Sequence, residues 1–435
     1  MRQSNNNENT KDSNLSELTY GNFDIICPYC FEKFHTYEVV FRASHNSSNG
    51  KFTQTFDKEL NDYRAKFKGE AIGKLNAVID AKAVSEENRI YDGNNVLIGI
   101  KDSEGKETYD RLCLYCHNRL PKKAGKVPMD IISIVGDTKV GKSVYIAALI
   151  RLLREKTADN FDAVCVPINN EIESRFMRDF EYRIFERNLM PEITQREMKQ
   201  EPLIFEFRFK DRNKPSVLLV FFDMAGEGIL DQDYLDIYAN HIKNSTGMMF
   251  LLDPLQISTI RPKILLKIES DESRLKKQKS LDAQENLIED GDFPRGPLSG
   301  LVALDDNFIV HEKDNRTKIP TAIVLTKSDL LEYLKEEDYF YDNSNTLINV
   351  DHEGFLNLSE VDNINGEVKN FLEKVCKPFK NYVYSLFEYH AYFAVSSLGH
   401  NPVDKKVSFT INPKRVCEPF LWLLWKLGYI EGRRK

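Results

Sequence analysis

Residues 136–143 have the types and the spacing that bind a chain of phosphates. They read Gly-Asp-Thr-Lys-Val-Gly-Lys-Ser and follow directly on the apolar run 129–135. In such a loop the glycines let backbone amides face the phosphates, Lys142 reaches the β and γ oxygens, and the Ser143 hydroxyl suits Mg²⁺. A glycine turn without a ligand is the alternative, but the β-branched strand before the motif and the apolar stretch after it favour nucleotide binding. The predicted phosphate site is Gly136, Asp137, Thr138, Lys139, Val140, Gly141, Lys142 and Ser143.

A second motif, Asp223-Met224-Ala225-Gly226, follows the apolar run 217–222. An aspartate at the end of a strand can hold Mg²⁺ through water, and the amide of Gly226 can sense a γ-phosphate. The D-x-x-G pattern is weak alone and becomes informative as the second of an ordered series. Asp223 and Gly226 are therefore predicted to contact Mg²⁺ and nucleotide.

The third motif identifies the base. It is Thr326-Lys327-Ser328-Asp329, at the end of the apolar run 319–326. A carboxylate at Asp329 accepts both the ring N–H and the exocyclic amine of guanine, a pairing that the edge of adenine cannot match. The aliphatic stem of Lys327 can lie along the base plane. A fourth segment, with Ser397 and Leu398 after the run 390–396, can offer the Ser397 amide to guanine O6.

Together these residues resemble the P-loop GTPases of the translation-factor-related, Ras-like class. More narrowly, the chain resembles the bacterial double-GTPase group, whose members often carry an N-terminal zinc ribbon and are predicted parts of conflict or defence systems. The resemblance implies a Mg²⁺-dependent GTPase that converts GTP to GDP and phosphate, with protein partners in a multi-component system and self-association as a further option. The segments that carry it are Cys27-Pro28-Tyr29-Cys30, Arg119-Leu120-Pro121, the phosphate loop, 247–254 and 416–424.

The resemblance also implies further residues of a hydrolytic site beside Lys142. A switch threonine that contacts Mg²⁺ is needed before the D-x-x-G motif, and Thr194 is the candidate, although an ordinary loop threonine fits almost as well. Glu227 stands where Ras-like enzymes have a glutamine that orients water, and because a carboxylate cannot donate as an amide does, slow unaided hydrolysis is expected. Lys139 stands where related enzymes place an asparagine or an arginine finger, so it can neutralise transition-state charge. A lysine pointing to solvent is the alternative there.

Four cysteines form two C-x-x-C pairs, Cys27 with Cys30 and Cys113 with Cys116. Each pair makes a tight turn with two thiolates, and four sulfurs complete a tetrahedron around Zn²⁺ with no open position. The predicted site is structural and adds folding energy. The C-x-x-C-H string ending at His117 also matches haem attachment, which requires export, so His117 is expected at the surface or behind the ligands. The excursion between the pairs is predicted to hold a helix over 56–80 and a strand over 95–100.

The elements that must position these residues alternate as strands and helices. The predicted strands are 130–135, 202–210, 216–222, 247–252, 319–326 and 390–396, which indicate a mainly parallel α/β sheet with helices on both faces. The second and third strands are too close for a crossover and predict an antiparallel hairpin with one antiparallel edge strand. The expected organisation is a disordered lead over 1–18, a zinc-ribbon module over 19–127 and a GTPase domain over 128–435. A charged insertion at about 257–316 is expected to be solvated, and a C-terminal helix within 413–429 is expected to close the sheet.

The bulk composition limits the partners. The net charge of −7 and the pI near 5.8 provide no global basic field for nucleic acid, whose binding stays unproven. No apolar run is long enough for a membrane span, and the polar start of the chain lacks an apolar signal segment, so the cytoplasm is the expected location. Two alternatives to a GTP-hydrolysing switch stay open. One is a GTP-binding regulatory module with little turnover, and the other is a P-loop ATPase in signalling.

Overall fold

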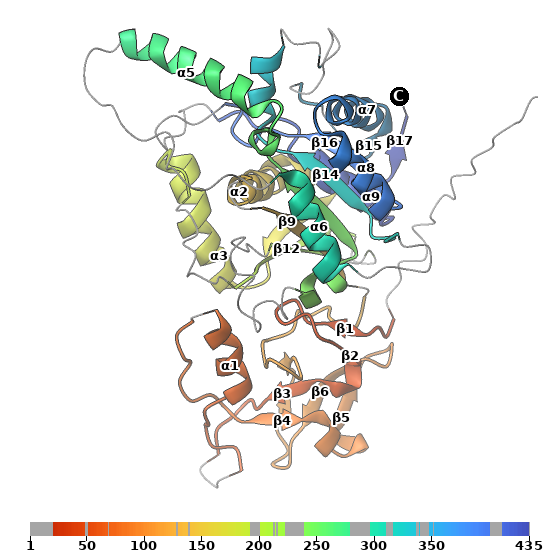
Figure 1. The fold of residues 1–435 in the computed structure, drawn as a ribbon. Helices are drawn as coiled ribbons and strands as arrows, with labels where there is room; N and C mark the ends of the chain where they lie inside the picture. The colour runs from red at the N-terminus through yellow and green to blue at the C-terminus, as the bar shows by residue number, and fades with distance from the viewer. Residues whose placement is uncertain are drawn as a thin grey trace, which may run out of the picture.

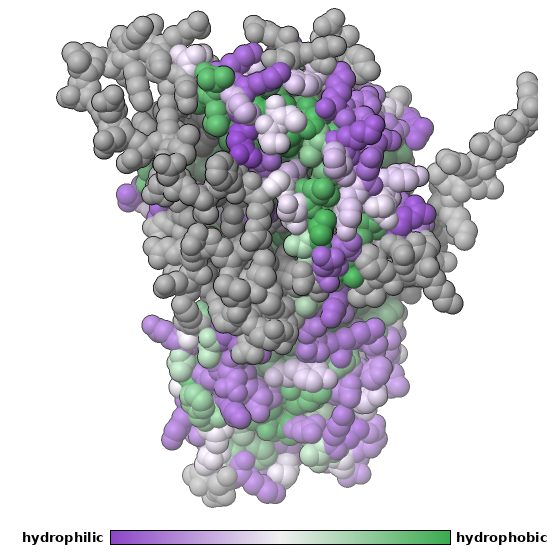
Figure 2. All heavy atoms as spheres, in the orientation of Figure 1, coloured by the Kyte–Doolittle hydropathy of each residue, from purple (hydrophilic) through white to green (hydrophobic). Residues whose placement is uncertain are grey.

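The computed structural model describes residues 21–47, 51–67, 69–127, 129–137, 140–191, 201–211, 214, 216–221, 239–278, 296–309, 316–335, 339, 348–350, 352–400 and 411–434. Figure 1 shows residues 21–127, red to orange, on one side of the remainder of the chain, yellow to blue. We call residues 21–127 the cysteine module. On the face drawn in Figure 2, hydrophilic side chains cover much of the described surface of both parts, with hydrophobic ones interspersed.

Seven strands form one sheet in the order β10-β11-β12-β9-β13-β14-β16. β9 pairs in parallel with β12 and with β13, and the parallel ladder continues through β14 to β16. Every residue of β12, β13 and β14 is buried, as continuous apolar runs predict for strands covered on both faces. The predicted mainly parallel sheet is confirmed. Its parallel strands are β9 (Asp130–Gly136), β12 (Val217–Phe221), β13 (Gly247–Leu252), β14 (Thr321–Leu325) and β16 (His390–Ala394).

The predicted hairpin is present, but it does not form the edge of the sheet. β11 (Leu203–Phe209) pairs antiparallel with β12, with Phe205 opposite Leu219. An additional strand, β10 (Ala163–Pro167), pairs antiparallel with the other side of β11 and takes the edge position. β10 escaped sequence analysis because it is short and alternates, with Val164 exposed between two buried residues. The expectation of an antiparallel strand at the edge is therefore wrong in detail, since the inner β11 is the reversed one.

Helices cover the sheet on both sides (Figure 1). α2 (Lys142–Leu152) contacts β9, α7 (Leu358–Val375) contacts β16, and α9 (Glu418–Lys426) contacts β13 and β14. Most apolar side chains of α9 are buried, Phe420 and Leu424 among them, and each such burial contributes about 1.5–3 kcal/mol. The C-terminal helix thus covers its own sheet, as expected. The remaining helices here are η5 (Leu153–Thr157), η6 (Asp159–Phe161), α3 (Asn170–Phe176), η7 (Met177–Glu186), η9 (Pro254–Gln256), η10 (Ser328–Leu334) and α8 (Lys377–Leu386).

The charged insertion is only partly solvated. α5 (Arg261–Gln278) projects from the body of the domain in Figure 1, yet Ile264 near its start is fully buried. α6 (Pro297–Phe308) packs against α8 and buries Leu301. Two short strands, β15 (Leu356–Asn357) and β17 (Gly432–Arg433), pair in parallel near the end of the chain. Within the described residues, we find no helix long and apolar enough to cross a lipid bilayer.

The described residues of the cysteine module form three small sheets, one α-helix and three short 3₁₀ helices. Its expected strand is β6, but the helix expected over 56–80 is confined to α1, and residues 78–80 form a strand instead. α1 begins at Asp57, whose carboxylate accepts from the Leu60 amide. The elements are β1 (Ile25–Ile26), β2 (Lys33–Phe34), η2 (Thr36–Glu38), β3 (Val40–Arg42), α1 (Lys58–Lys66), β4 (Val78–Asp80), η3 (Ala81–Ala83), η4 (Glu86–Asn88), β5 (Arg89–Tyr91), β6 (Leu97–Lys101), β7 (Glu107–Thr108) and β8 (Arg111–Leu112).

Candidate nucleotide site and cysteine cluster

The phosphate loop joins the carboxyl end of β9 to the first turn of α2. β9 is the strand at which the sheet order reverses, since its neighbours β12 and β13 lie on opposite sides, and ligands of parallel sheets bind at such a point. The Lys142 side chain is buried, and its ammonium donates to the Gly136 carbonyl at 2.8 Å and to the Asp137 carbonyl at 3.1 Å. Ser143 is half-buried at the same helix start. Lysine, hydroxyl and helix N-terminus therefore converge on one loop.

Both glycines of the loop are required by geometry. A Cβ atom at Gly136 would lie 2.8 Å from the Leu251 carbonyl oxygen of the neighbouring strand, which is closer than carbon atoms tolerate. Gly141 has φ of +86°, a left-handed conformation that residues with a Cβ rarely adopt. The G-x-x-x-x-G-K-S spacing thus reflects one close approach between strands and one left-handed turn.

Side chains from two loops, after β13 and after β14, tie the phosphate loop to the third motif. The Thr326 hydroxyl lies 2.8 Å from the Val140 carbonyl and 3.0 Å from the Leu252 carbonyl, so it links the phosphate loop to β13. The Lys327 ammonium forms an ion pair with the buried carboxylate of Asp253. A Cβ at Gly141 would lie 3.7 Å from Cε of Lys327, so the lysine stem passes over the glycine turn. Thr326 and Lys327 therefore stand beside the phosphate loop, and their contact with nucleotide stays a prediction.

The Asp329 carboxylate is held by residues 396–399 after β16, which we call the base loop because the sequence predicts that Ser397 in it contacts the base. The Ser396 hydroxyl donates to Asp329 Oδ1 at 2.5 Å, and the same hydroxyl accepts from the Gly399 amide at 2.9 Å. Burial raises the pKa of the Asp329 carboxyl above its ordinary value, while the Ser396 hydrogen bond opposes that rise. Ser397 is half-buried and Leu398 is buried in this loop. The structure thus brings the third and fourth motifs together around one carboxylate.

A segment near the C-terminus supports the loop from behind. Residues 411–416, which we call the strap, pair with it through two bonds between Ser396 and Lys414, of 3.1 and 2.7 Å, and through the Asn412 amide on the Leu398 carbonyl at 2.9 Å. A Cβ at Gly399 would lie 2.3 Å from the Asn412 carbonyl oxygen, so only glycine fits there. The strap also accepts at Val416 from the Tyr145 hydroxyl of α2, at 3.1 Å. One segment therefore contacts both the base loop and the helix that begins at the phosphate loop.

The strap is anchored by a buried ion pair. The Arg415 guanidinium donates to Glu418 Oε2 at 2.9 Å, and both side chains are almost fully buried. The same guanidinium donates to the Ile348 carbonyl at 3.2 Å, and the backbone amide of Arg415 donates to Asn349 Oδ1 at 2.9 Å. His352 lies with Nε2 3.5 Å from the other oxygen of Glu418. A charged group removed from water in this way is stabilised only while its partner is present.

Several predicted residues lie outside the described part of the chain. They are Thr138 and Lys139 of the phosphate loop, the switch candidate Thr194, and Asp223, Gly226 and Glu227 of the second motif. β12 ends at Phe221 beside β9 in parallel register, with Val220 opposite Ser133. The strand that leads into the second motif therefore runs toward the same edge of the sheet as the phosphate loop.

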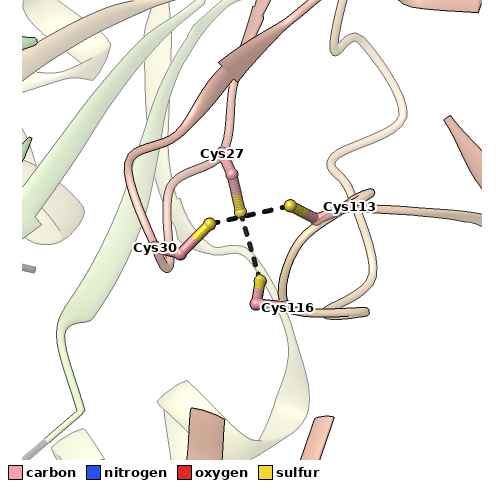
Figure 3. A group of neighbouring side chains, drawn as sticks. All are labelled: Cys27, Cys30, Cys113 and Cys116. Carbon is pink, nitrogen blue, oxygen red and sulfur yellow. Dashed lines mark hydrogen bonds between the residues drawn. The ribbon is translucent and has the colours of Figure 1, made fainter. Parts of the chain in front are cut away.

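The four paired cysteines converge, as Figure 3 shows. Cys27 Sγ lies 3.7 Å from Cys116 Sγ, Cys30 Sγ lies 3.6 Å from Cys113 Sγ, and all four sulfurs lie within 4.8 Å of one another. A zinc tetrahedron with bonds of about 2.3 Å places its sulfurs roughly 3.8 Å apart. Burial raises the pKa of the Cys27 thiol well above its ordinary value, so a thiolate there requires a cation. The donor set and spacing fit a closed Zn²⁺ site.

His117 follows the second cysteine pair without joining it. Its Nδ1 lies 2.8 Å from Asp57 Oδ1, so it links the cysteine turn to the start of α1. Asp57, Glu59 and His117 are close enough together to hold a metal. Asp57 already accepts from Arg42 at 2.6 Å and from the Leu60 amide at 3.1 Å, so its oxygens are engaged in structural bonds. The position behind the cysteine ligands agrees with the sequence expectation for His117.

Sequence analysis missed three residues that this geometry makes important. Ser396 stands at the end of the predicted strand 390–396, two residues after the end of β16, and a hydroxyl at such a strand end is a signal for a partner of Asp329. Asp253 follows β13 immediately, and an acidic residue at that strand end is a sign of a lysine partner. Arg415 carries no signal, because an arginine in a C-terminal segment is usually solvated and only the fold shows that it is buried.

The sheet order, the phosphate loop and the base loop define a P-loop GTPase domain. The family model named Double-GTPase 2 matches residues 130–365, which is more than half of the 435-residue chain. The chain belongs to the Double-GTPase 2 family.

One relative and two solved structures illustrate what this chain is similar to. The "Putative ESX-1 scaffolding and assembly protein SaeC" of Mycolicibacterium smegmatis is 24% identical over 340 residues, 73% of this chain and 80% of that protein. The GTP-bound Ski7 GTPase-like domain of S. cerevisiae is 12% identical at a TM-score of 0.31, with 68% of this chain and 50% of that chain covered. The small GTPase Arl6 of Trypanosoma brucei is 11% identical at a TM-score of 0.25, with 69% and 97% covered.

Proposed function

We propose that this protein is a GTP-binding switch that hydrolyses GTP to GDP and phosphate with Mg²⁺. The observation that carries the proposal is the pair of loops at one edge of the sheet, where the Lys142-bearing cradle lies beside the Ser396-supported carboxylate of Asp329. Thr326 joins the two, since its hydroxyl bonds the Val140 carbonyl of the cradle. A site that held phosphate alone would not need a carboxylate oriented in this way.

Each residue has a distinct role in this proposal. Lys142 and the loop amides hold the phosphates, and Ser143 with Asp223 organises Mg²⁺. Asp329 accepts from the guanine N–H groups, and the Ser397 amide faces O6. Loss of the γ-phosphate would release contacts of Thr194 and Gly226 and so change the affinity for a partner.

Hydrolysis is expected to be slow in the isolated protein. Glu227 in place of a glutamine cannot donate to a phosphate oxygen while it orients water, and its charge opposes that of the nucleotide. Lys139 is the candidate that neutralises transition-state charge on activation. Turnover measured over a range of protein concentrations, for the wild type and for Lys139→Ala, tests this role and self-association together. An unchanged rate in the variant removes Lys139 from the catalytic set.

We further propose that the protein is a cytoplasmic component of a bacterial multi-component system, of the conflict or defence kind. The supporting finding is the double-GTPase family, together with a relative whose name assigns it to scaffolding and assembly of ESX-1. In this proposal the parts are a lead over 1–18, a zinc-ribbon module over 19–127 held by Zn²⁺, and a GTPase domain over 128–435. The zinc module then serves protein contacts, because the chain, at a net charge of −7, provides no basic field for nucleic acid.

One experiment separates this function from its two rivals. The native protein is analysed for co-purified nucleotide and metal, and phosphate release is then measured with GTP and with ATP. We expect guanine nucleotide, one zinc per chain and release from GTP only. Bound GTP without release indicates a binding module, and equal use of ATP indicates a P-loop ATPase. Lys142→Ala should abolish binding, whereas Lys210→Ala, an exposed lysine paired with Asp159, serves as the matched control.

A further inference from the structure

The first cysteine turn sits directly on the GTPase domain. Phe31, which follows Cys30, has a left-handed φ of +62° that directs its backbone away from the turn. Its ring packs against the imidazole of His241 with centroids 4.6 Å apart, and its carbonyl accepts from Asn244 Nδ2 at 3.0 Å. The next residue, Glu32, accepts from Asn240 Nδ2 at 2.8 Å. A single helical stretch, residues 239–243 with Asn244 after it, thus receives the cysteine turn.

The same helical stretch is bonded to the strand that carries the phosphate loop. His241 is fully buried, and its Nε2 lies 2.8 Å from the Ser133 hydroxyl of β9. Ser133 also bonds the Ser245 hydroxyl, which in turn donates to the His241 carbonyl at 2.7 Å. Three residues after Ser133, the strand reaches Gly136. The imidazole therefore has the cysteine turn on one face and the strand of the phosphate loop at its edge.

This arrangement has one internally consistent set of proton positions. If the Ser245 hydroxyl donates to the His241 carbonyl, then Ser133 donates to Ser245 and His241 Nε2 donates to Ser133, so each of the three bonds has one donor and one acceptor. Buried polar networks of this kind fix one geometry, because a displaced member leaves its neighbours without partners in a medium of low dielectric. A shift of β9 would therefore disturb the bonds that orient His241, and with them the packing of its ring against Phe31.

A second contact joins the cysteine turn to another element of the GTPase domain. The Tyr29 hydroxyl accepts from Asn169 Nδ2 at 3.1 Å, and Asn169 caps α3 by accepting from the Ile172 amide at 2.8 Å. The helical segment that continues α3 packs on α2, where the Arg151 guanidinium lies 4.3 Å from the centre of the Phe185 ring. Residues on both sides of Cys30 thus contact elements that adjoin the phosphate loop.

We propose that the cysteine turn and the nucleotide site are energetically coupled through Phe31, His241 and Ser133, so that the bound nucleotide sets the stability of the turn. The proposal rests on the proposed GTP binding and adds that this binding changes the stability of the cysteine turn. The turn carries two of the four proposed metal ligands. Because coupling between sites is reciprocal, a partner that binds the cysteine module would also change the affinity for nucleotide. The cysteine module is then the part of the protein through which the nucleotide state affects a partner.

Amide hydrogen exchange on the full-length protein tests the coupling at two reporter positions. The Phe31 amide donates to the Cys27 carbonyl at 2.9 Å, and the His117 amide donates to the Cys113 carbonyl at 3.1 Å, one in each cysteine turn. Exchange is compared without nucleotide, with GDP and with a non-hydrolysable GTP analogue. We expect the Phe31 amide to exchange at rates that differ by about 5- to 150-fold between nucleotide states, the usual range of coupling between sites.

Two variants and a control locate the path. His241→Asn keeps a polar group for Ser133 but removes the ring under Phe31, and it should abolish the nucleotide dependence at Phe31. Asn244→Ala removes the bond to the Phe31 carbonyl, together with a bond of 3.0 Å to the Asn240 carbonyl of its own helical stretch, and should reduce the dependence, which keeps the test valid if His241→Asn folds poorly. Glu171→Ala breaks the exposed pair with Arg64, another contact between the two parts at 3.4 Å, and should leave the dependence intact.

The outcomes separate this inference from the proposed function. Binding of a fluorescent GTP analogue is measured on the same samples. If guanine nucleotide does not bind, the proposed function fails. If it binds and the Phe31 amide exchanges equally in all states, or if both His241→Asn and Asn244→Ala retain the full dependence, the coupling is refuted while GTP binding stands.

Discussion

The Ser396 hydroxyl donates a 2.5 Å hydrogen bond to the Asp329 carboxylate, across the tips of two adjacent parallel strands. This bond engages one oxygen of the carboxylate, so the second oxygen and the remaining lone pairs can accept hydrogen bonds from a base. It also explains why a serine in the loop after β16 is needed, since a carboxylate without an orienting donor would have no fixed direction in a half-buried position.

Asp329→Asn should exchange the preferred base. The carboxylate accepts from the N–H and the amine of guanine, whereas an amide accepts once and donates once, which suits the second carbonyl of xanthine. We expect GTP affinity to fall about 10- to 150-fold, the loss of one hydrogen bond to a charged group, and XTP affinity to rise. Competition of GTP, XTP and ATP against a fluorescent analogue measures this. A variant with unchanged guanine preference would show that Asp329 does not contact the base.

Arg415→Met should destabilise the domain and weaken base recognition. Removing the guanidinium leaves Glu418 buried without its partner, which costs about 3–5 kcal/mol in comparable cases. The double variant Arg415→Met with Glu418→Leu should regain part of that stability, because no unpaired charge remains. Urea unfolding of the two proteins gives the comparison, and GTP affinity of the double variant reports whether the strap still positions the loop of Ser396. Equal stability of the single and double variants would contradict the ion-pair account.

Acid should destabilise the protein through His241. Burial lowers the pKa of His241 to about 3, so the unfolded chain takes up a proton below pH 6.5 that the folded protein does not. The contribution of neutral His241 to the free energy of unfolding should therefore be fully present above pH 6.5, and it should be lost as the pH drops from there toward 3. Between pH 7 and pH 4.5 the free energy of unfolding should fall by roughly 2–3 kcal/mol because of this one residue. Urea unfolding at a series of pH values, for the wild type and for His241→Asn, isolates this contribution, and parallel pH profiles of the two proteins would disprove it.

Loss of one cysteine ligand should disorder the cysteine module. Cys113→Ser removes a sulfur from the four-cysteine cluster, and because metal binding supplies folding energy to such small modules, we expect the zinc content and the protection of residues 21–127 from protease to fall together. Cys165→Ser is the matched control, since Cys165 is a buried cysteine in β10, outside the cluster. Metal analysis and limited proteolysis decide the outcome. A Cys113→Ser protein that keeps one zinc per chain would rule out the four-sulfur site.

The predictable parts of this molecule are those in which local sequence and fold agree. Continuous apolar runs such as 247–252 are long and buried on both faces, so their strand character is visible without the structure. β10 is not visible in this way, because its exposed Val164 interrupts the apolar pattern and its pairing depends on β11. Lys142 and Asp329 are recognised by type and spacing. Arg415 and His241 are recognised only from contacts between residues far apart in the chain, and the bond of Ser396 to Asp329 likewise becomes visible only in the fold.

The close approach of Gly399 to Asn412 has a consequence for engineering. The base loop and the strap fit each other so tightly that neither can be replaced alone, because any side chain at 399 would collide with the backbone of 412. A chimaera that borrows residues 396–399 from another protein would need the matching stretch 411–416 as well. The two stretches should therefore be exchanged together in any variant designed to change the nucleotide preference.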